Sequence, residues 1–224
     1  MAVLISMQKV FLNGDFIDKD SAKISIFDRG FIFGDGIYEV VPVINGVMVE
    51  KQGFWDRFKR SLNEIDLSLP YSKDEFENIL NELIKINSLN EGGIYIQITR
   101  GIAQRDFSFV SGITPTVMAF AFSDSVLEHP GAKSGITIIS TPDIRWKRRD
   151  IKSISLLGQC YAKNQATIAG ADECFMVEDG YVTEAGSSSA FIIKDGALIT
   201  KPLSNEILPG IRRQRLLNLA KEIG

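Results

Sequence analysis

The stretch that decides the fold is Arg148-Arg149-Asp150-Ile151-Lys152-Ser153-Ile154-Ser155-Leu156-Leu157, taken together with an earlier one, Asp28-Arg29-Gly30-Phe31-Ile32-Phe33-Gly34-Asp35-Gly36-Ile37-Tyr38-Glu39-Val40. In the later stretch Lys152 lies between Ile151 and Ile154, where we expect a strand to give way to a helix. A strand end projects side chains into a cleft. Burial there disfavours the charged ammonium, and a neutral amine is the form that attacks an aldehyde. A lysine outside any motif is usually a solvated surface residue, so the rest of the sequence must decide.

The composition is that of an ordinary globular protein. The 224 residues, 45% hydrophobic and 24% charged, suffice for a sizeable core. A net charge of −3 argues against non-specific nucleic-acid binding, which needs a basic surface. We expect the short basic run 147–149 to be a solvated strand end rather than a phosphate site. A single histidine, His129, argues against a histidine-based mechanism and a multi-histidine metal site.

Cysteine usage and apolar content favour a cytoplasmic protein. Cys160 and Cys174 lie in apolar surroundings and are predicted to be core thiols rather than a disulfide framework. The first residues lack the basic region of a signal peptide. No apolar run approaches the length of a membrane span. We therefore expect a reducing compartment and no membrane partner.

Local patterns predict a mixture of hairpins and helices. Asn-Gly and Asp-Gly supply the positive φ angles of two-residue hairpin turns, and the last two such pairs predict a meander of consecutive antiparallel strands. Residues 55–65 and 76–84 place apolar side chains at helical spacing, and a capping-box pattern starts at Ser72. The turn pairs are Asn13-Gly14, Asn45-Gly46, Asp179-Gly180 and Asp195-Gly196.

These elements indicate an α+β protein of two domains. Residues 123–135 contain glycine, proline and charged residues and form the predicted interdomain linker. The predicted domains are therefore an N-terminal α/β domain over 1–122 and a C-terminal domain over 136–224. Further strands are expected at 94–99, 116–122 and 136–141, and helices at about 155–169 and from about 211.

The opening stretches, with the motifs described below, resemble the fold-type IV (class IV) aminotransferases, which use pyridoxal 5′-phosphate (PLP). Within that group the chain looks most like the D-amino acid aminotransferases. The resemblance runs from Phe11 to Gly224. It implies an α+β fold with a smaller N-terminal α/β domain and a β-barrel-like C-terminal domain that binds PLP. It also implies a homodimer.

The resemblance assigns the chemistry to Lys152 and Glu184. Lys152 would carry PLP as a Schiff base and act as general base and acid. Glu184, in Val182-Thr183-Glu184-Ala185-Gly186-Ser187-Ser188-Ser189, matches the carboxylate that keeps the pyridine nitrogen protonated. Ser187 and Ser188 offer hydroxyl donors to the cofactor. One departure is Ser155, where relatives commonly have asparagine.

Two segments resemble the family's phosphate site. Arg57, on an early predicted helix, resembles the phosphate-binding arginine. The run Leu208-Pro209-Gly210-Ile211-Arg212 resembles the second element, in which the amides of Ile211 and Arg212 face the phosphate and Leu208 lies under the ring. Relatives usually have threonine where Arg212 stands, so this side chain either adds charge to the phosphate or turns outwards.

Substrate choice in the D-amino acid enzymes depends on a tyrosine and an arginine that hold the substrate carboxylate. Tyr38 fits the tyrosine, and Arg105 fits the arginine. Relatives commonly complete this trap with a histidine two residues later, where this chain has Phe107.

The resemblance predicts PLP-dependent transamination between D-amino acids and 2-oxo acids, of the type D-alanine plus 2-oxoglutarate giving pyruvate plus D-glutamate. Alternatives of the same fold are a branched-chain L-amino acid aminotransferase and an aminodeoxychorismate lyase. An alternative of another class is a non-catalytic, truncated chain. Relatives continue well past the equivalent of Gly224, so we expect either a fragment or a natural short form, with exposed apolar surface and weaker PLP binding.

Overall fold

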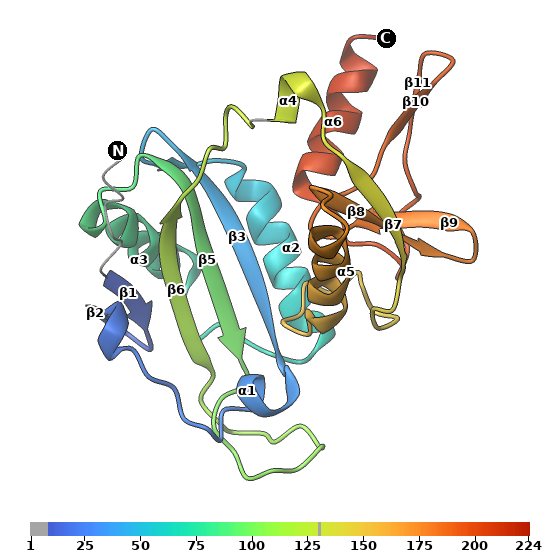
Figure 1. The fold of residues 1–224 in the computed structure, drawn as a ribbon. Coiled ribbons are helices and arrows are strands. Elements are labelled where there is room, and N and C mark those ends of the chain that lie inside the picture. Colours follow the sequence, from blue (N-terminus) through green and yellow to red (C-terminus); the bar gives the residue numbers. More distant parts are fainter. Residues whose placement is uncertain (1–8, 130) are drawn as a thin grey trace. The chain divides into compact units, whose positions relative to one another are not determined.

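The computed structural model describes residues 9–129 and 131–224 of the chain. These divide into two compact units, one up to His129 and the other after it. Both units mix helices and strands, which confirms the α+β class (Figure 1). The bounds predicted for the linker stay a prediction. No helix in the described ranges is long and apolar enough to cross a membrane.

The first unit is built on a six-stranded antiparallel sheet in the order β2-β1-β6-β5-β3-β4. Helices α2 and α3 cover one face of it (Figure 1). A 3-10 turn, η1, and a short helix, α1, lie between β2 and β3. The elements are β1 (Lys9–Leu12), β2 (Asp15–Asp18), η1 (Lys19–Ser21), α1 (Arg29–Phe33), β3 (Gly36–Ile44), β4 (Val47–Met48), α2 (Lys51–Glu64), α3 (Lys73–Ile86), β5 (Glu91–Thr99) and β6 (Thr116–Ser123).

Apolar periodicity explains how the two helices pack on the sheet. The buried rings of Phe54 and Phe58 on α2 stack with centroids 5.3 Å apart, and Phe58 lies 6.1 Å from Phe76 on α3. Each fully buried aromatic side chain removes a large apolar area from water, so these contacts dominate the core. The capping box predicted at Ser72 is present, with Glu75 as its second member. This confirms where α3 begins.

The second unit contains smaller sheets. In the first of them β7 and β8 are parallel and joined through α5, and β9 pairs antiparallel with β8. Its core is small: Ala162 and Ala166 of α5 pack on Cys174 and Met176 of β8. The elements are α4 (Gly131–Ser134), β7 (Ile138–Pro142), α5 (Leu157–Ile168), β8 (Glu173–Glu178), β9 (Tyr181–Ala185), β10 (Ile192–Lys194), β11 (Ala197–Ile199) and α6 (Ile211–Glu222).

All four predicted hairpins are confirmed. Asn13, Asn45, Asp179 and Asp195 have φ angles of 50°, 52°, 51° and 51°, and each is followed by a glycine with positive φ. The strands on either side pair with a two-residue turn between them. The predicted meander is wrong, because β8–β9 and β10–β11 belong to different sheets.

Three expectations drawn from local sequence are wrong: the burial of Cys160, the exposure of the run 147–149 and the strand end at Lys152. In each case contacts with distant parts of the chain determine the outcome. Cys160 is exposed on α5, while Cys174 is the buried core thiol. The basic run is not a solvated strand end, because the Arg149 side chain is 1% exposed and paired with acidic residues. Lys152 lies in an irregular segment between β7 and α5 rather than at a strand end, since β7 ends at Pro142.

A buried group of charges ties the irregular segments of the first unit to its sheet. Asp35 accepts hydrogen bonds from Arg29 Nε at 2.7 Å and from Arg100 Nε at 2.9 Å. All three side chains are at most 7% exposed. The arginines also donate to backbone carbonyls, Arg29 to Asp106 at 2.6 Å and Arg100 to Ile65 at 2.6 Å. One carboxylate therefore holds two arginines, of which Arg29 binds the loop 100–115 and Arg100 binds the segment that follows α2.

Asp35→Asn should destabilise this unit strongly. The substitution leaves two buried guanidinium groups without a counter-charge, and breaking a buried ion pair in this way costs about 3–5 kcal/mol. Denaturant unfolding of the purified chain measures the loss. The matched control is Asp18→Asn: the Asp18 side chain is 61% exposed and that of its partner Lys9 38%, so the expected loss is about 0–1 kcal/mol. Equal effects of the two variants would show that Asp35 is not a structural centre.

Candidate active site

Glu184 is a buried carboxylate near the end of β9, 6% exposed. Arg145 Nη1 donates to its Oε2 at 2.5 Å, and the backbone N–H of Leu208 donates to its Oε1 at 3.1 Å. Burial raises the pKa of Glu184, and the hydrogen bond and charge of Arg145 only partly offset this. An ionised carboxylate has about four lone-pair sites, so Glu184 can still accept a further N–H donor. This suits the ring-nitrogen role expected for Glu184.

The structure brings Glu184 together with Leu208, another predicted site residue. The small-residue run 185–189 follows Glu184 directly in the sequence. The hydroxyl-bearing Ser187 and Ser188 follow β9 and are exposed. The Ser188 carbonyl accepts from Ala185 N at 2.8 Å, so this is a tight turn. Gly210 lies close to the run, because a Cβ atom on it would come 2.9 Å from Ser189 Oγ. The run therefore packs closely against the start of α6, and a side chain at position 210 would have to displace the Ser189 hydroxyl.

The start of α6 has the features of an anion site. Its N-cap is Gly210, which provides no side-chain cap to the first amides, including those of Ile211 and Arg212. Uncapped amides at a helix N-terminus attract anions. The buried cation here is Arg213, which is 7% exposed, whereas Arg212 is exposed. Arg213 Nη2 donates to the Lys201 carbonyl at 2.9 Å, and its Nε has no hydrogen-bond partner among the described residues.

These observations fit a phosphate-bearing cofactor. A buried guanidinium with an unsatisfied N–H is costly unless an anion meets it. Sequence analysis left the direction of the Arg212 side chain open and did not consider Arg213, because neighbouring arginines on a helix differ only in the direction they face. The helical spacing of buried positions was the available signal, but α6 is too polar for that signal to be clear.

Lys152 is half-buried in the irregular segment that precedes α5. The residues just before it are buried: Arg149, Asp150 and Ile151 are each 4% exposed. Asp150 pairs with Arg148, and the Ser153 N–H donates to the Ile151 carbonyl at 2.8 Å. The backbone around Lys152 is therefore fixed by neighbours that sequence analysis did not identify.

In the first unit Arg57 is held by Glu39, a partner the sequence did not indicate. The pair is bidentate, with Arg57 Nε to Glu39 Oε1 and Nη2 to Oε2, each at 2.7 Å. Glu39 is fully buried on β3. Successive strand residues face opposite sides of a sheet, so Tyr38 points away from Glu39. Tyr38 is half-buried and stacks on Tyr95 at 5.5 Å, and burial raises the pKa of Tyr95 to about 12.

Arg105 is exposed on the loop 100–115 and lies against aromatic rings. Its guanidinium carbon is 5.2 Å from the ring centre of Phe107 and 5.8 Å from that of Phe33. The neighbouring Asp106 carbonyl is the one that Arg29 binds. Phe107, which replaces the histidine expected from the family, therefore contacts the arginine directly.

Comparisons with known proteins agree on one family. The family described as "Amino-transferase class IV" matches residues 36–224. The D-alanine aminotransferase of Staphylococcus haemolyticus is 44% identical over 209 residues, which are 93% of this chain and 74% of that protein. The D-alanine aminotransferase of Bacillus licheniformis is 38% identical over 216 residues, 96% of this chain and 76% of that protein.

Solved structures show the same fold. The branched-chain amino acid aminotransferase of Escherichia coli superposes with a TM-score of 0.87 at 22% identity, covering 97% of this chain and 75% of that one. The enzyme of the same name from Thermoproteus uzoniensis, solved with norvaline, gives a TM-score of 0.82 at 25% identity, with coverage of 97% and 75%.

Arg213→Gln should weaken phosphate binding to the chain without cofactor. Charge-assisted hydrogen bonds contribute about 1.5–3 kcal/mol, so affinity for inorganic phosphate should fall roughly ten- to a hundred-fold. The matched variant Arg212→Gln removes an exposed arginine from the adjacent position and should change affinity little. Calorimetric titration with inorganic phosphate measures both. A larger loss in Arg212→Gln would return the role to Arg212.

Proposed function

This chain belongs to the class IV aminotransferase family, and on that premise we propose that it is a PLP-dependent D-amino acid aminotransferase. It transfers the amino group of a D-amino acid to a 2-oxo acid, in the manner of D-alanine plus 2-oxoglutarate. The observation that carries the proposal is the identity of 38–44% to proteins named D-alanine aminotransferase over more than nine-tenths of the chain. The buried Glu184 and the anion site at α6 support it.

PLP supplies, when bound, an electron sink for the pair left behind when a Cα proton is removed. Lys152 would hold the cofactor through its ε-amine until the substrate amine takes that place, and the freed ε-amine would then take up the substrate Cα proton as general base and return it as general acid. Glu184 accepts the ring N–H and keeps that nitrogen protonated. Leu208 would contact the ring, and the hydroxyls of Ser187 and Ser188 would donate hydrogen bonds to oxygen atoms of the cofactor.

The phosphate is bound by charge and by backbone amides. Ile211 and Arg212 present N–H groups at the start of α6, and Arg213 adds the buried guanidinium. Arg57, whose guanidinium is held by Glu39, is a further phosphate ligand that we propose from the resemblance alone. Tyr38 and Arg105 hold the substrate carboxylate. Rigid supports of this kind lower the cost of ordering a site when the ligand binds.

We propose two further properties. The protein acts as a homodimer, because the first unit exposes large apolar side chains near α1 and the loop 100–115, which a second copy would cover. These are Ile26, Phe31, Ile102 and Phe107, which are 70%, 69%, 56% and 76% exposed. The protein is cytoplasmic, a proposal supported by its two unpaired cysteines.

Borohydride should fix PLP covalently on Lys152. Reduction followed by peptide mass spectrometry locates the modified lysine. Lys152→Ala should abolish fixation, because the amine that carries the cofactor is gone. Lys163→Ala is the matched control: Lys163 lies on α5 in the same unit, pairs with Glu173 at 3.2 Å, and should leave fixation unchanged. If borohydride fixes PLP on Lys163 in the wild type, the assignment of Lys152 as the cofactor-binding lysine is wrong.

D-alanine should be a much better donor than L-leucine with 2-oxoglutarate as acceptor.

Arg105→Ala should raise the KM for D-alanine roughly ten- to a hundred-fold while PLP affinity stays constant, because a guanidinium–carboxylate contact contributes about 1.5–3 kcal/mol. Gln104→Ala, an exposed neighbour, is the control. Preference for L-leucine would favour the branched-chain alternative, and loss of PLP in Arg105→Ala would move Arg105 to the phosphate.

A further inference from the structure

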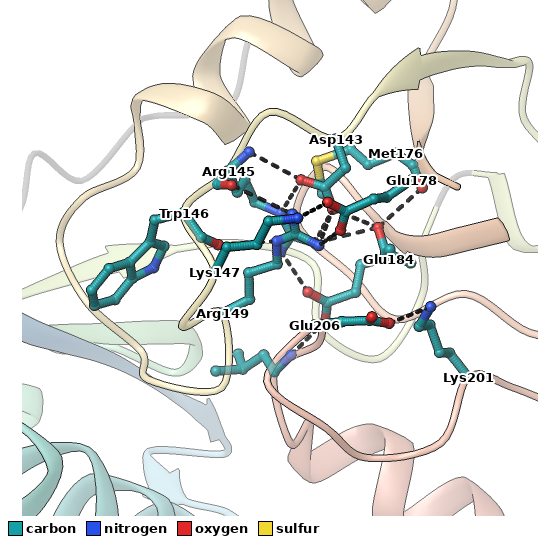
Figure 2. Close-up of polar contacts among 12 residues, drawn as sticks. Asp143, Arg145, Trp146, Lys147, Arg149, Met176, Glu178, Glu184, Lys201 and Glu206 are labelled. Carbon is teal, nitrogen blue, oxygen red and sulfur yellow. Dashed lines mark hydrogen bonds and ion pairs between the residues drawn. The ribbon is translucent and has the colours of Figure 1, made fainter. Parts of the chain in front are cut away.

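An alternating series of charges runs from the buried Glu184 to the surface of the second unit (Figure 2). Arg145 bridges Glu184 and Asp143, and Arg149 bridges Asp143 and Glu178. The nitrogen–oxygen distances along it are 2.5, 2.7, 3.2 and 2.6 Å. Lys147, which is 78% exposed, pairs with Glu178 and ends the series. Every buried charge in it has an opposite charge on at least one side.

Asp143 is the centre of this series, with a side chain that is fully buried. Its Oδ1 accepts from Arg145 Nε at 3.0 Å, and its Oδ2 accepts from Arg145 Nη2 at 2.7 Å and from Thr183 Oγ1 at 2.6 Å. Burial alone would raise the pKa of Asp143, but the hydrogen bonds from Arg145 and Thr183 outweigh burial and lower it. Asp143 is therefore an anion that binds the Nε and Nη2 groups of Arg145. This orients the remaining Nη1 group of Arg145 toward Glu184.

The same aspartate also supports the segment that carries Lys152. The Asp143 N–H donates to the Val177 carbonyl at 2.8 Å, which joins the segment to β8. Arg149, bound to Asp143, precedes Lys152 by three residues, and its own N–H donates to the Asn205 carbonyl at 3.0 Å. Gly158 of α5 closes on Arg145, since a Cβ there would lie 3.0 Å from Arg145 Cγ.

We propose that Asp143 is a positioning residue of the cofactor site, which orients Arg145 and shares its positive charge, so that Glu184 keeps enough negative charge to hold a proton on the cofactor's ring nitrogen. This inference rests on the proposed role of Glu184. Arg145 lies between the carboxylates of Asp143 and Glu184. The more strongly it pairs with Asp143, the less it neutralises Glu184. Arg149 competes with Arg145 for Asp143 and thereby also affects Glu184.

Substitutions in the middle of the series should act with opposite signs. Asp143→Asn leaves Arg145 to neutralise Glu184 alone, and the proton affinity of the ring nitrogen falls. In Arg149→Gln, Asp143 pairs with Arg145 alone, so Arg145 neutralises Glu184 less. The proton affinity of the ring nitrogen therefore rises. Each variant changes the net charge of the series by one but leaves the neighbouring groups paired: Arg145 with Glu184 in the first, and Glu178 with Lys147 in the second.

The experiment uses the full chain loaded with PLP that is ¹⁵N-labelled in the ring, and follows the ring-nitrogen shift by NMR as pH is varied. Asp143→Asn should lower the proton affinity about tenfold, which is one pKa unit for the ring nitrogen, and Arg149→Gln should raise it. Glu184→Gln should give the largest fall. Asp172→Asn is the structural control: Asp172 accepts from Thr137 N at 2.7 Å in the same unit and lies outside the series.

The outcomes separate this inference from the proposed function. If Glu184→Gln lowers the affinity but Asp143→Asn and Arg149→Gln do not move it in opposite directions, Asp143 is only structural. An unchanged affinity in Glu184→Gln would overturn the role of Glu184 and this inference with it. If Asp143→Asn binds too little PLP, unfolding of the cofactor-free chain decides: the effects of Asp143→Asn and Glu184→Gln should be non-additive, and additivity would overturn the coupling.

Discussion

An aspartate buried between two arginines is the interaction on which the irregular part of each unit depends. Asp35 lies between Arg29 and Arg100 in the first unit, and Asp143 lies between Arg145 and Arg149 in the second. A buried charge is tolerated only when it is paired and its remaining donors are satisfied. In both units the arginines use spare donors on loop carbonyls, such as those of Asp106 and Trp146. Each charged centre thus replaces the hydrogen bonds that a helix or sheet would provide.

Two of the proposed functional residues, Arg105 and Lys152, lie on the segments held in this way. Arg105 follows Arg100 on the first unit's loop, and Lys152 follows Arg149 on the second unit's irregular segment. Loops carry function well when a rigid scaffold fixes them, but a loop has few apolar contacts of its own. Paired charges fix position and direction more sharply than apolar packing does. Here they place reactive side chains without burying those side chains completely.

Local sequence signals were enough for the turns, the capped helix and the fold class. Asn13 and Asp179 adopt the positive φ expected of their Asn-Gly and Asp-Gly turns, and Ser72 caps α3 through its immediate neighbours. Long-range partners were not predictable from one sequence. Asp143 and Arg145 carry no motif, Arg213 differs from Arg212 only in the face it occupies, and the absence of β9–β10 pairing depends on tertiary packing. The resemblance supplied Glu184, but not the arginine that neutralises it.

The fold alone does not distinguish D-amino acid from L-amino acid enzymes, so the surroundings of single residues such as Arg105 matter. The E. coli branched-chain enzyme shares the fold at a TM-score of 0.87, so the scaffold is common to both classes. In this chain the loop arginine Arg105 lies beside Phe33 and Phe107. Aromatic faces attract a guanidinium without neutralising it, unlike a carboxylate. Among the described residues Arg105 has no acidic partner within ion-pair distance, so its charge is available to a substrate carboxylate. In the proposed trap, Phe107 stands where the resemblance leads us to expect a histidine, so one donor is absent and Arg105 is the proposed source of positive charge.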